Sequence, residues 1–267
     1  MDDENKEVKE MRAFSQRQRE LLAAAILGPA VSLLSVDARA QRPIERSLKV
    51  NGQVEIEART NSEDLSVRVG EEGSVFIRCL VKPQNDSDSD SDLVEKTAQY
   101  AESNLPVRQD GNHISIEPLG ERQLLRHANL QYELTVPANT KLNFTTGSGD
   151  LSVEGIRGPV EFSSSSGDIQ VRSVRESVRA HTSSGDVALE DSGNKGIEVQ
   201  TDSGDVAVRL AAEAGYDLSA HTGSGDFSIG HELTLEPGDT KHEVRGKVRG
   251  GGAPLNIRTS SGDIRID

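Results

Sequence analysis

The sequence predicts an all-β protein, a parallel β-solenoid, from two observations. The tripeptide Ser-Gly-Asp occurs six times, centred on Gly149, Gly167, Gly185, Gly204, Gly225 and Gly262. These glycines are 18, 18, 19, 21 and 37 residues apart, and a fixed period in this range is typical of a solenoid. Apolar residues also alternate with polar ones on both sides of each tripeptide, which indicates two short strands per copy that share one buried face. We therefore expect coils of about 18–21 residues with two short strands each, wound into a right-handed β-helix.

The first forty residues have the layout of a secretory signal peptide. Basic residues precede an apolar run of 16 residues at 21–36, and Ala38 and Ala40 occupy the −3 and −1 positions of a cleavage site. The run is shorter than the roughly 20 residues of a membrane-spanning helix. We predict cleavage after Ala40, no stable membrane insertion of the mature chain, and a periplasmic, cell-surface or secreted location. An uncleaved signal anchor is the alternative.

Charge and composition narrow the choice of partners. The chain has 44 acidic and 30 basic residues, a formal net charge of −14. Such a surface repels nucleic acid and anionic lipid, so we expect no nucleic-acid partner. Aromatic residues make up 3% of the chain and there is no Trp, so the core is expected to consist of Val, Ile, Leu and Ala. The single cysteine, Cys79, lies in phase with the apolar Val75, Ile77 and Val81, and we expect it to be buried.

Residues 41–140 are predicted to form the N-terminal β part of the solenoid. Asn51-Gly52 separates two alternating stretches, which indicates a hairpin with a type I′ turn. The second stretch leads into a degenerate copy of the repeat at 60–67, with Glu63 in place of the glycine. Loss of the glycine suggests a relaxed turn at this copy.

An acidic segment at 85–92 interrupts the strand pattern. An EF-hand loop that began at Asp86 would need Gly at its sixth position and Glu at its twelfth, and the chain has Ser91 and Thr97 there. We therefore interpret the segment as a solvated loop. Asp92, with Glu95 three residues later, is expected to cap a short helix at about 93–103.

Residues 141–267 form the regular T-x-S-G-D array. When positions are counted from each glycine, those at −7, −5, +2 and +4 are apolar in every copy, which places them inside. Continuing the same alternation places the Thr or Ser at −3 and the Ser at −1 on the inner side of the turn. The glycine is expected to supply a positive φ.

The aspartate at +1 is the chemically ambiguous position, because stacked carboxylates repel one another. Its six members are Asp150, Asp168, Asp186, Asp205, Asp226 and Asp263. Each carboxylate can accept hydrogen bonds from its own turn N–H groups, or a calcium ion can bridge neighbours. The array lacks the repeat pattern of calcium β-rolls, so we favour the structural role and keep a calcium-stabilised β-roll as an alternative.

The 37-residue interval before Gly262 is interpreted as one extra coil with an excursion, for which a hairpin is one form. The strand after Asp263 is then the terminal rung of the stack. An exposed terminal strand offers a site for end-to-end pairing of two molecules.

No nucleophile elbow, phosphate loop or zinc-ligand spacing occurs in the chain. His181 and His221 share position −4 and are expected to lie about two rungs apart, as surface residues. We therefore predict no catalytic residue and no cofactor. A carbohydrate-active β-helix, either a polysaccharide lyase or a hydrolase, is the enzymatic alternative.

The six T/S-x-S-G-D copies, the degenerate copy at 60–67 and the strand Tyr132–Val136 together resemble the putative-adhesin family of exported bacterial β-strand repeat proteins, a family of unknown function. The resemblance covers nearly all of 44–267 and implies a β-helical envelope or secreted protein without catalytic residues. We thus expect a non-enzymatic binding or scaffolding surface for an unidentified protein or glycan of the cell envelope. The ligand is expected to contact the variable positions at −6, −4 and +3.

Overall fold

The computed structural model describes residues 43–83, 91–120, 128–190, 192, 195–210, 213, 215–235 and 240–267. They belong to one compact unit, Gln41–Asp267. The predicted signal peptide, including Ala38 and Ala40, lies outside the described residues, and so does most of the predicted acidic loop at 85–92. Within the described ranges, no helix is both long and apolar enough to cross a membrane.

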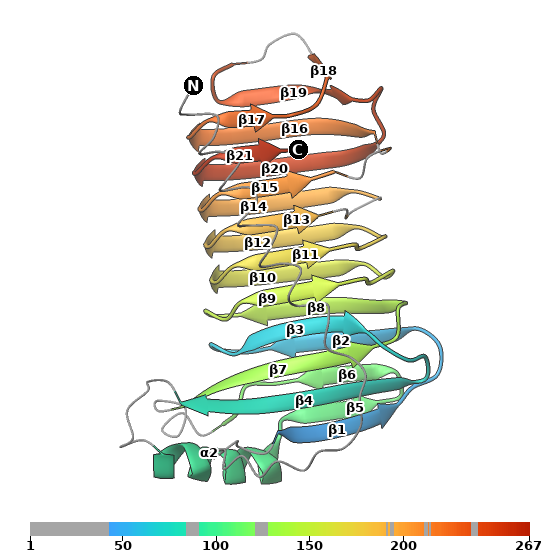
Figure 1. Ribbon diagram of the computed structural model, residues 1–267, viewed down its shortest axis with the longest axis vertical. Helices are drawn as coiled ribbons and strands as arrows, with labels where there is room; N and C mark the ends of the chain where they lie inside the picture. The colour runs from blue at the N-terminus through green and yellow to red at the C-terminus, as the bar shows by residue number, and fades with distance from the viewer. Residues whose placement is uncertain are drawn as a thin grey trace, which may run out of the picture. The chain divides into compact units, whose positions relative to one another are not determined.

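The described residues form two long sheets and one helix, so the all-β prediction is confirmed (Figure 1). The first sheet has the strand order β1 (Ile44–Lys49), β4 (Ser74–Pro83), β7 (Ala128–Val136), β3 (Asp64–Val69), β9 (Leu151–Glu154), β11 (Ile169–Arg172), β13 (Val187–Glu190), β15 (Val206–Arg209), β21 (Ile264–Ile266), β17 (Phe227–Ile229). The second has the order β18 (Leu233–Leu235), β19 (Glu243–Val248), β16 (Tyr216–Ser224), β20 (Ala253–Ser261), β14 (Ile197–Ser203), β12 (Val178–Ser184), β10 (Val160–Ser166), β8 (Thr140–Thr146), β2 (Val54–Arg59), β6 (His113–Ile116), β5 (Val107–Asp110). The helix is α2 (Ser91–Asn104).

Each copy of the repeat contributes one strand to each sheet, and we call such a pair of strands a rung. Neighbouring rungs pair in parallel and in register: Val160 of β10 lies opposite Val178 of β12, and Phe162 lies opposite Ala180. Equivalent positions of successive copies therefore form straight columns along the stack. This arrangement is solenoid-like, and the handedness of its winding stays a prediction.

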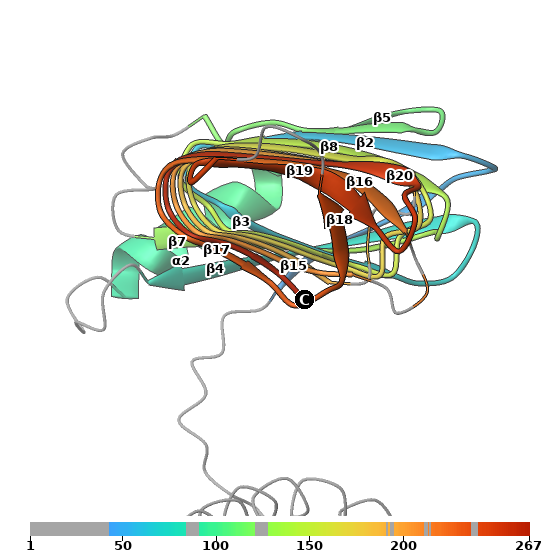
Figure 2. The same ribbon diagram turned by 90° about the horizontal axis from the view of Figure 1, so that it is seen from above.

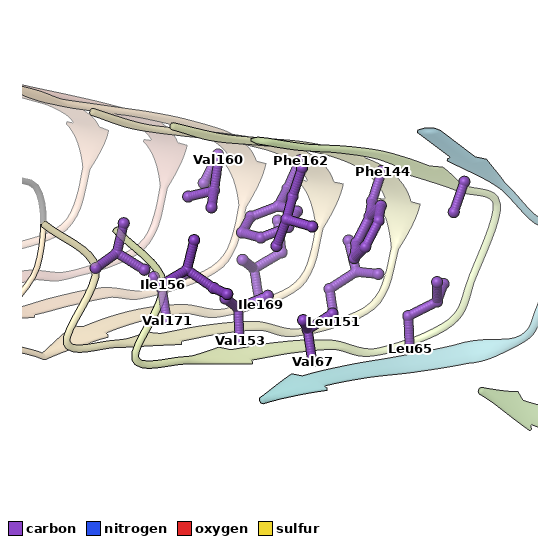
Figure 3. Packing of buried hydrophobic residues seen from close by; sticks show 14 of the residues in the cluster. Leu65, Val67, Phe144, Leu151, Val153, Ile156, Val160, Phe162, Ile169 and Val171 are labelled. Atoms are coloured by element: carbon purple, nitrogen blue, oxygen red, sulfur yellow. The ribbon is translucent and has the colours of Figure 1, made fainter. Parts of the chain in front are cut away.

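The core fills the space between the two sheets. Residues at −7, −5 and +2 of one copy, such as Val160, Phe162 and Ile169, point from facing strands into one interior (Figure 3). Each is no more than 2% exposed. Phe144 and Phe162 stack in one column with their ring centroids 5.8 Å apart, a separation typical of favourable aromatic pairs. The core thus runs continuously from rung to rung, as the column pattern predicts.

The C-terminal rung is not at the end of the stack, so the prediction of a terminal rung is wrong. Strand β20 pairs with β14 on one side and with β16 on the other. In the other sheet β21 lies between β15 and β17 (Figure 1). The last residues of the chain therefore separate two rungs that are consecutive in sequence.

The described residues of the long interval before Gly262 contain the expected excursion, which is a hairpin, but they do not form an additional coil. Strand β19 runs antiparallel to β16, and β18 runs antiparallel to β19. This hairpin lies at the end of the stack that is farthest from α2 (Figure 1 and Figure 2). The chain then returns between β14 and β16, which leaves β17, and not the last strand, at the edge of its sheet.

The N-terminal end differs from the predicted hairpin. Gly52 has a φ of 89°, which is typical of a tight turn, but β1 pairs with β4 in one sheet while β2 joins the other. Asn51-Gly52 thus carries the chain between sheets. The degenerate copy is confirmed as a rung, since β2 pairs with β8 and β3 pairs with β9. The predicted helix is also confirmed, and α2 packs against β1, β4 and β7. It begins at Ser91, however, so Asp92 lies in its first turn and not at the predicted cap position.

Cys79 is fully buried in β4, as expected. Burial raises the pKa of its thiol to about 12. Because the thiolate is the nucleophile, about one molecule in ten thousand is reactive at pH 8. We expect less than a tenth of the native protein to be alkylated by iodoacetamide in an hour at pH 8, and the urea-unfolded protein to react fully, as measured by intact mass. Rapid alkylation of the native protein would contradict this burial.

Candidate binding surface

The repeat glycines are required because successive rungs approach closely. A β-carbon on any of the six would lie 2.0–2.3 Å from a backbone carbonyl oxygen of the adjacent rung. Only Gly167 and Gly262 have a φ in the left-handed region, at 153° and 154°. The expectation that every repeat glycine supplies a positive φ is therefore wrong, and the lack of a side chain is what the position demands.

Glu63 occupies the position of the repeat glycine in the degenerate copy, which is the first copy in the chain. The strand next to β3 on the side away from β9 is β7, which belongs to no copy of the repeat. The Glu63 side chain is 2% exposed, and its carboxylate accepts N–H groups from Asn61 at 2.6 Å and Ser62 at 2.9 Å. The turn without glycine is therefore capped by its own side chain rather than relaxed.

The hydroxyl groups at −3 face inward, as predicted. All six residues are at most 4% exposed. Thr222 donates to the carbonyl of Gly262 at 2.9 Å, and Thr259 donates to that of Gly204 at 3.2 Å. The buried hydroxyl of Ser164 has no such partner. This column therefore ties the turns of neighbouring rungs together.

The serines at −1 are exposed, so the prediction that they face inward is wrong. The burial pattern of β10 ends in two consecutive exposed residues, Ser165 and Ser166, and that of β14 ends in Asp202 and Ser203. Strand alternation stops after −3 because the chain there begins to turn toward the other sheet. A prediction that continues the strand alternation past −3 therefore places the serine at −1 on the wrong face.

The six predicted aspartates form a ladder along this turn edge. The backbone N–H of each donates to a carboxylate oxygen of the aspartate on the neighbouring rung, at 2.8–3.0 Å. Asp64 of the degenerate copy accepts the first of these bonds. The favoured structural role is thus realised between rungs, whereas sequence reasoning assigned it to each residue's own turn. Across the described ranges, no group of three or more metal-ligating side chains is placed to hold an ion.

Two substitutions of Asp186 distinguish the contribution of its hydrogen bond to stability from the contribution of its charge. Alanine removes the acceptor of the Asp205 N–H and is expected to lower the free energy of unfolding by about 1–2 kcal/mol. Asparagine keeps an acceptor and removes one repelling charge, so it is expected to cost under about 0.5 kcal/mol. Urea unfolding of both variants with and without calcium checks this. An asparagine variant as unstable as the alanine variant, together with a calcium-dependent rise in the free energy of unfolding of the wild type measured in the same way, would favour a calcium ladder instead.

The positions at −6, −4 and +3 lie on the outside of the stack, as predicted. In rung order, column −4 reads Thr145, Ser163, His181, Gln200, Arg258, His221. His181 and His221 are therefore three rungs apart, and the expected separation of two is wrong because β20 lies between them. Side chains differ from rung to rung in these columns, in contrast to the constant turn columns.

One outer face carries charges of alternating sign. Glu154, Arg172, Glu190 and Arg209 follow one another in register along the first sheet. Asp267 comes next, because its backbone exchanges hydrogen bonds with Val208 and Leu210, on either side of Arg209. Glu190 pairs with Arg172 at 3.4 Å and with Arg209 at 2.8 Å. Beside these pairs lies a shallow groove of about 120 Å³ that includes Ala188 and Ala207. The positive and negative charges on this face nearly balance.

A larger groove of about 560 Å³ lies at the loops on the opposite side from the aspartate ladder. Its lining residues are mostly polar: Gly52, Gln53, Glu72, Asn139, Arg157, Gly158, Pro159 and Glu176. Glu176 is paired with Lys195 at 2.8 Å. Sequence reasoning missed this groove because its residues come from separate loops that only the stacking of rungs brings together. Its volume lies within the range of about 300–1,000 Å³ that is common for ligand sites.

The Toastrack DUF4097 family matches residues 46–267, which is most of the chain. This chain belongs to the Toastrack DUF4097 family. A crystal structure described as a putative cell adhesion protein from Clostridium sporogenes ATCC 15579 is similar to this Toastrack protein, with a TM-score of 0.51 and 13% sequence identity over 84% of this chain and 99% of that chain. A putative adhesin from Bacteroides fragilis NCTC 9343 has a TM-score of 0.38 and 9% identity over 85% of this chain and 98% of its own. The predicted membership of a family of unknown function is confirmed by the match to the Toastrack DUF4097 family, and the likeness to the Clostridium structure shows the fold. Among curated protein sequences none matches this chain.

Proposed function

We propose that this Toastrack protein is a non-enzymatic, exported component of the cell envelope that presents a binding or scaffolding surface. The observation that carries the proposal is that the constant positions of the repeat hold the stack together, whereas the variable positions face outward. Gly, Asp and the hydroxyl at −3 are used within the stack, while the outward columns vary along it. Repeat proteins of this kind use extended outer surfaces for binding. The description of the Clostridium protein as a putative cell adhesion protein supports the same reading.

The larger groove is the part of this surface that we propose contacts a ligand. Gln53 and Asn139 offer amide donors and acceptors, and Glu72 and Arg157 offer exposed charged groups. Such a lining suits a polar ligand that exchanges hydrogen bonds, such as an envelope glycan or an extended peptide. Export is proposed from the predicted signal peptide, and mass spectrometry of the envelope fraction tests it by whether the chain begins at Gln41.

Binding to isolated envelope material tests the proposal with matched variants of the full chain. Replacing Glu72 and Arg157 together with alanine removes two charged groups from the groove and is expected to weaken binding at least about tenfold. The control replaces the exposed turn serines Ser184 and Ser203 with alanine and is expected to bind like the wild type. Thermal unfolding shows whether both variants fold.

The same preparation, assayed for cleavage of a panel of glycans, distinguishes the enzymatic alternative. The proposed function predicts envelope binding without cleavage. Lyase or hydrolase activity in the absence of envelope affinity would overturn it.

A further inference from the structure

The C-terminal rung, residues 253–267, is internal to the stack although it is the last part of the chain. It pairs residue for residue with β14 and β16 in one sheet and with β15 and β17 in the other. Its apolar residues Leu255, Ile257, Ile264 and Ile266 are fully buried. The rungs on either side of it are consecutive in sequence, so the chain leaves a gap one rung wide and fills it with its own end.

In each turn contact that holds this rung, one partner lies within residues 253–267 and the other lies in a neighbouring rung. The N–H of Asp263 donates to Asp205 at 2.8 Å, and the N–H of Asp226 donates to Asp263 at 2.9 Å. Thr259 donates to the carbonyl of Gly204, and Thr222 donates to that of Gly262. An identical segment from a second molecule can therefore make the same contacts in the same gap.

The loop that joins this rung to β19 is short and strongly bent. Arg249, Gly250 and Gly251 are consecutive and all left-handed, with φ of 51°, 84° and 91°. The N–H of Gly251 donates to the carbonyl of Val248 at 3.1 Å. The two glycines adopt this backbone readily, so the strain of the loop lies at Arg249, whose side chain disfavours a left-handed conformation. Short hinge loops under strain favour exchange of the segment that they connect.

We propose that residues 253–267 are an exchangeable rung, so that two copies of this chain form a dimer in which each fills the gap of the other. The closed monomer and the exchanged dimer have the same rung contacts and differ mainly in the hinge at 249–251. The balance between them therefore depends on hinge conformation and protein concentration. Such a dimer would carry two copies of the outer surface, and the proposal does not depend on what that surface binds.

Co-refolding of two single-cysteine proteins tests the exchange with the natural hinge. In a Cys79→Ala background, one full-length copy carries Gln200→Cys and the other, marked by a mass difference, carries Arg258→Cys. These positions are Cα partners of neighbouring strands, at the ~4.7–4.9 Å spacing that a disulfide can bridge. After joint refolding from urea and mild oxidation, a heterodimer linked by this disulfide is expected, and its yield should rise with protein concentration.

The control pair carries Gln200→Cys and His221→Cys, neither of which lies in the exchanged residues 253–267. Exchange of that rung therefore does not place the cysteine of one molecule on the strand next to the cysteine of the other. Within one stack the two positions are two rungs apart, roughly 9–10 Å, which is too far for a disulfide. A heterodimer yield no higher than that of the control pair, at every protein concentration tested, would overturn the proposal.

A hinge variant, Gly250→Val with Gly251→Val, gives a second measurement. β-branched residues disfavour left-handed backbone, so the closed form should lose population and the heterodimer yield should rise at least about tenfold. Insertion of Gly-Ser-Gly after Gly251 relaxes the hinge and is expected to lower the yield. The proposal fails if a folded valine variant stays monomeric, and the natural-hinge pair decides if that variant does not fold.

Discussion

Replacement of Gly204 with alanine is expected to lower the free energy of unfolding by about 3 kcal/mol or more, at the upper end of overpacking effects. The new β-carbon would lie 2.0 Å from the carbonyl oxygen of Gly185. Neither backbone can easily move, because Gly204 donates to Ser261 at 3.0 Å and Gly185 donates to Ser203 at 3.2 Å. Urea unfolding followed by circular dichroism measures the loss.

Gly120 provides the matched control for this substitution. Its β-carbon would meet nothing nearer than the hydroxyl of Tyr100 at 4.0 Å, and its φ is not left-handed. Alanine at Gly120 is expected to change the free energy of unfolding by less than about 1 kcal/mol. The expected direction is an increase, because alanine lowers the conformational entropy of the unfolded chain. Equal losses at Gly204 and Gly120 would show that close approach of the rungs is not what requires the repeat glycine.

Replacement of Phe162 with alanine is the second large effect, with an expected loss of about 3–5 kcal/mol. The ring is 1% exposed and lies in its column between Phe144 and Ala180. The small Ala180 cannot fill the space that the ring would leave, so a cavity should remain. Urea unfolding again gives the measurement.

Substitutions on the same strand and at the same site serve as controls. Glu161 is exposed, and Glu161→Ala is expected to change stability by at most about 0.5 kcal/mol. Phe162→Leu keeps most of the buried volume and should cost about 1–1.5 kcal/mol. If alanine at Phe162 cost no more than leucine, the interior would be able to collapse around the missing ring.

The regular part of the fold was predictable because its signal is local and repeated. Apolar residues at −7, −5, +2 and +4 return at each glycine, and the strands pair in that same register. The predicted burial of Thr182 and Thr201 at −3 is correct for the same reason. The strands continue to Ser184 and Ser203, but the alternation of buried and exposed residues stops after −3, so it no longer predicts burial of these two serines.

The turn chemistry was only partly predictable. The sequence indicates that each aspartate needs hydrogen-bond donors, but the donor is the N–H of the next rung's aspartate. When one coil is considered alone, a positive φ is likewise the expected reason for the repeat glycine, whereas the stacked rungs show that it is needed because it has no side chain. Both roles become evident only when two rungs are stacked, because the partner atoms are 18 or more residues away in the chain.

By itself, the sequence determined the all-β class, the parallel pairing of equivalent strands, the buried columns and the degenerate copy at 60–67. Only the tertiary structure decided the order of the rungs, the groove around Arg157 and the position of β20 between β14 and β16. The physical reason is that every copy presents compatible columns to every other copy. Local patterns therefore specify that rungs stack without specifying which neighbour each one takes, and that choice depends on the β18–β19 hairpin and the bent loop at 249–251 that return the chain into the gap.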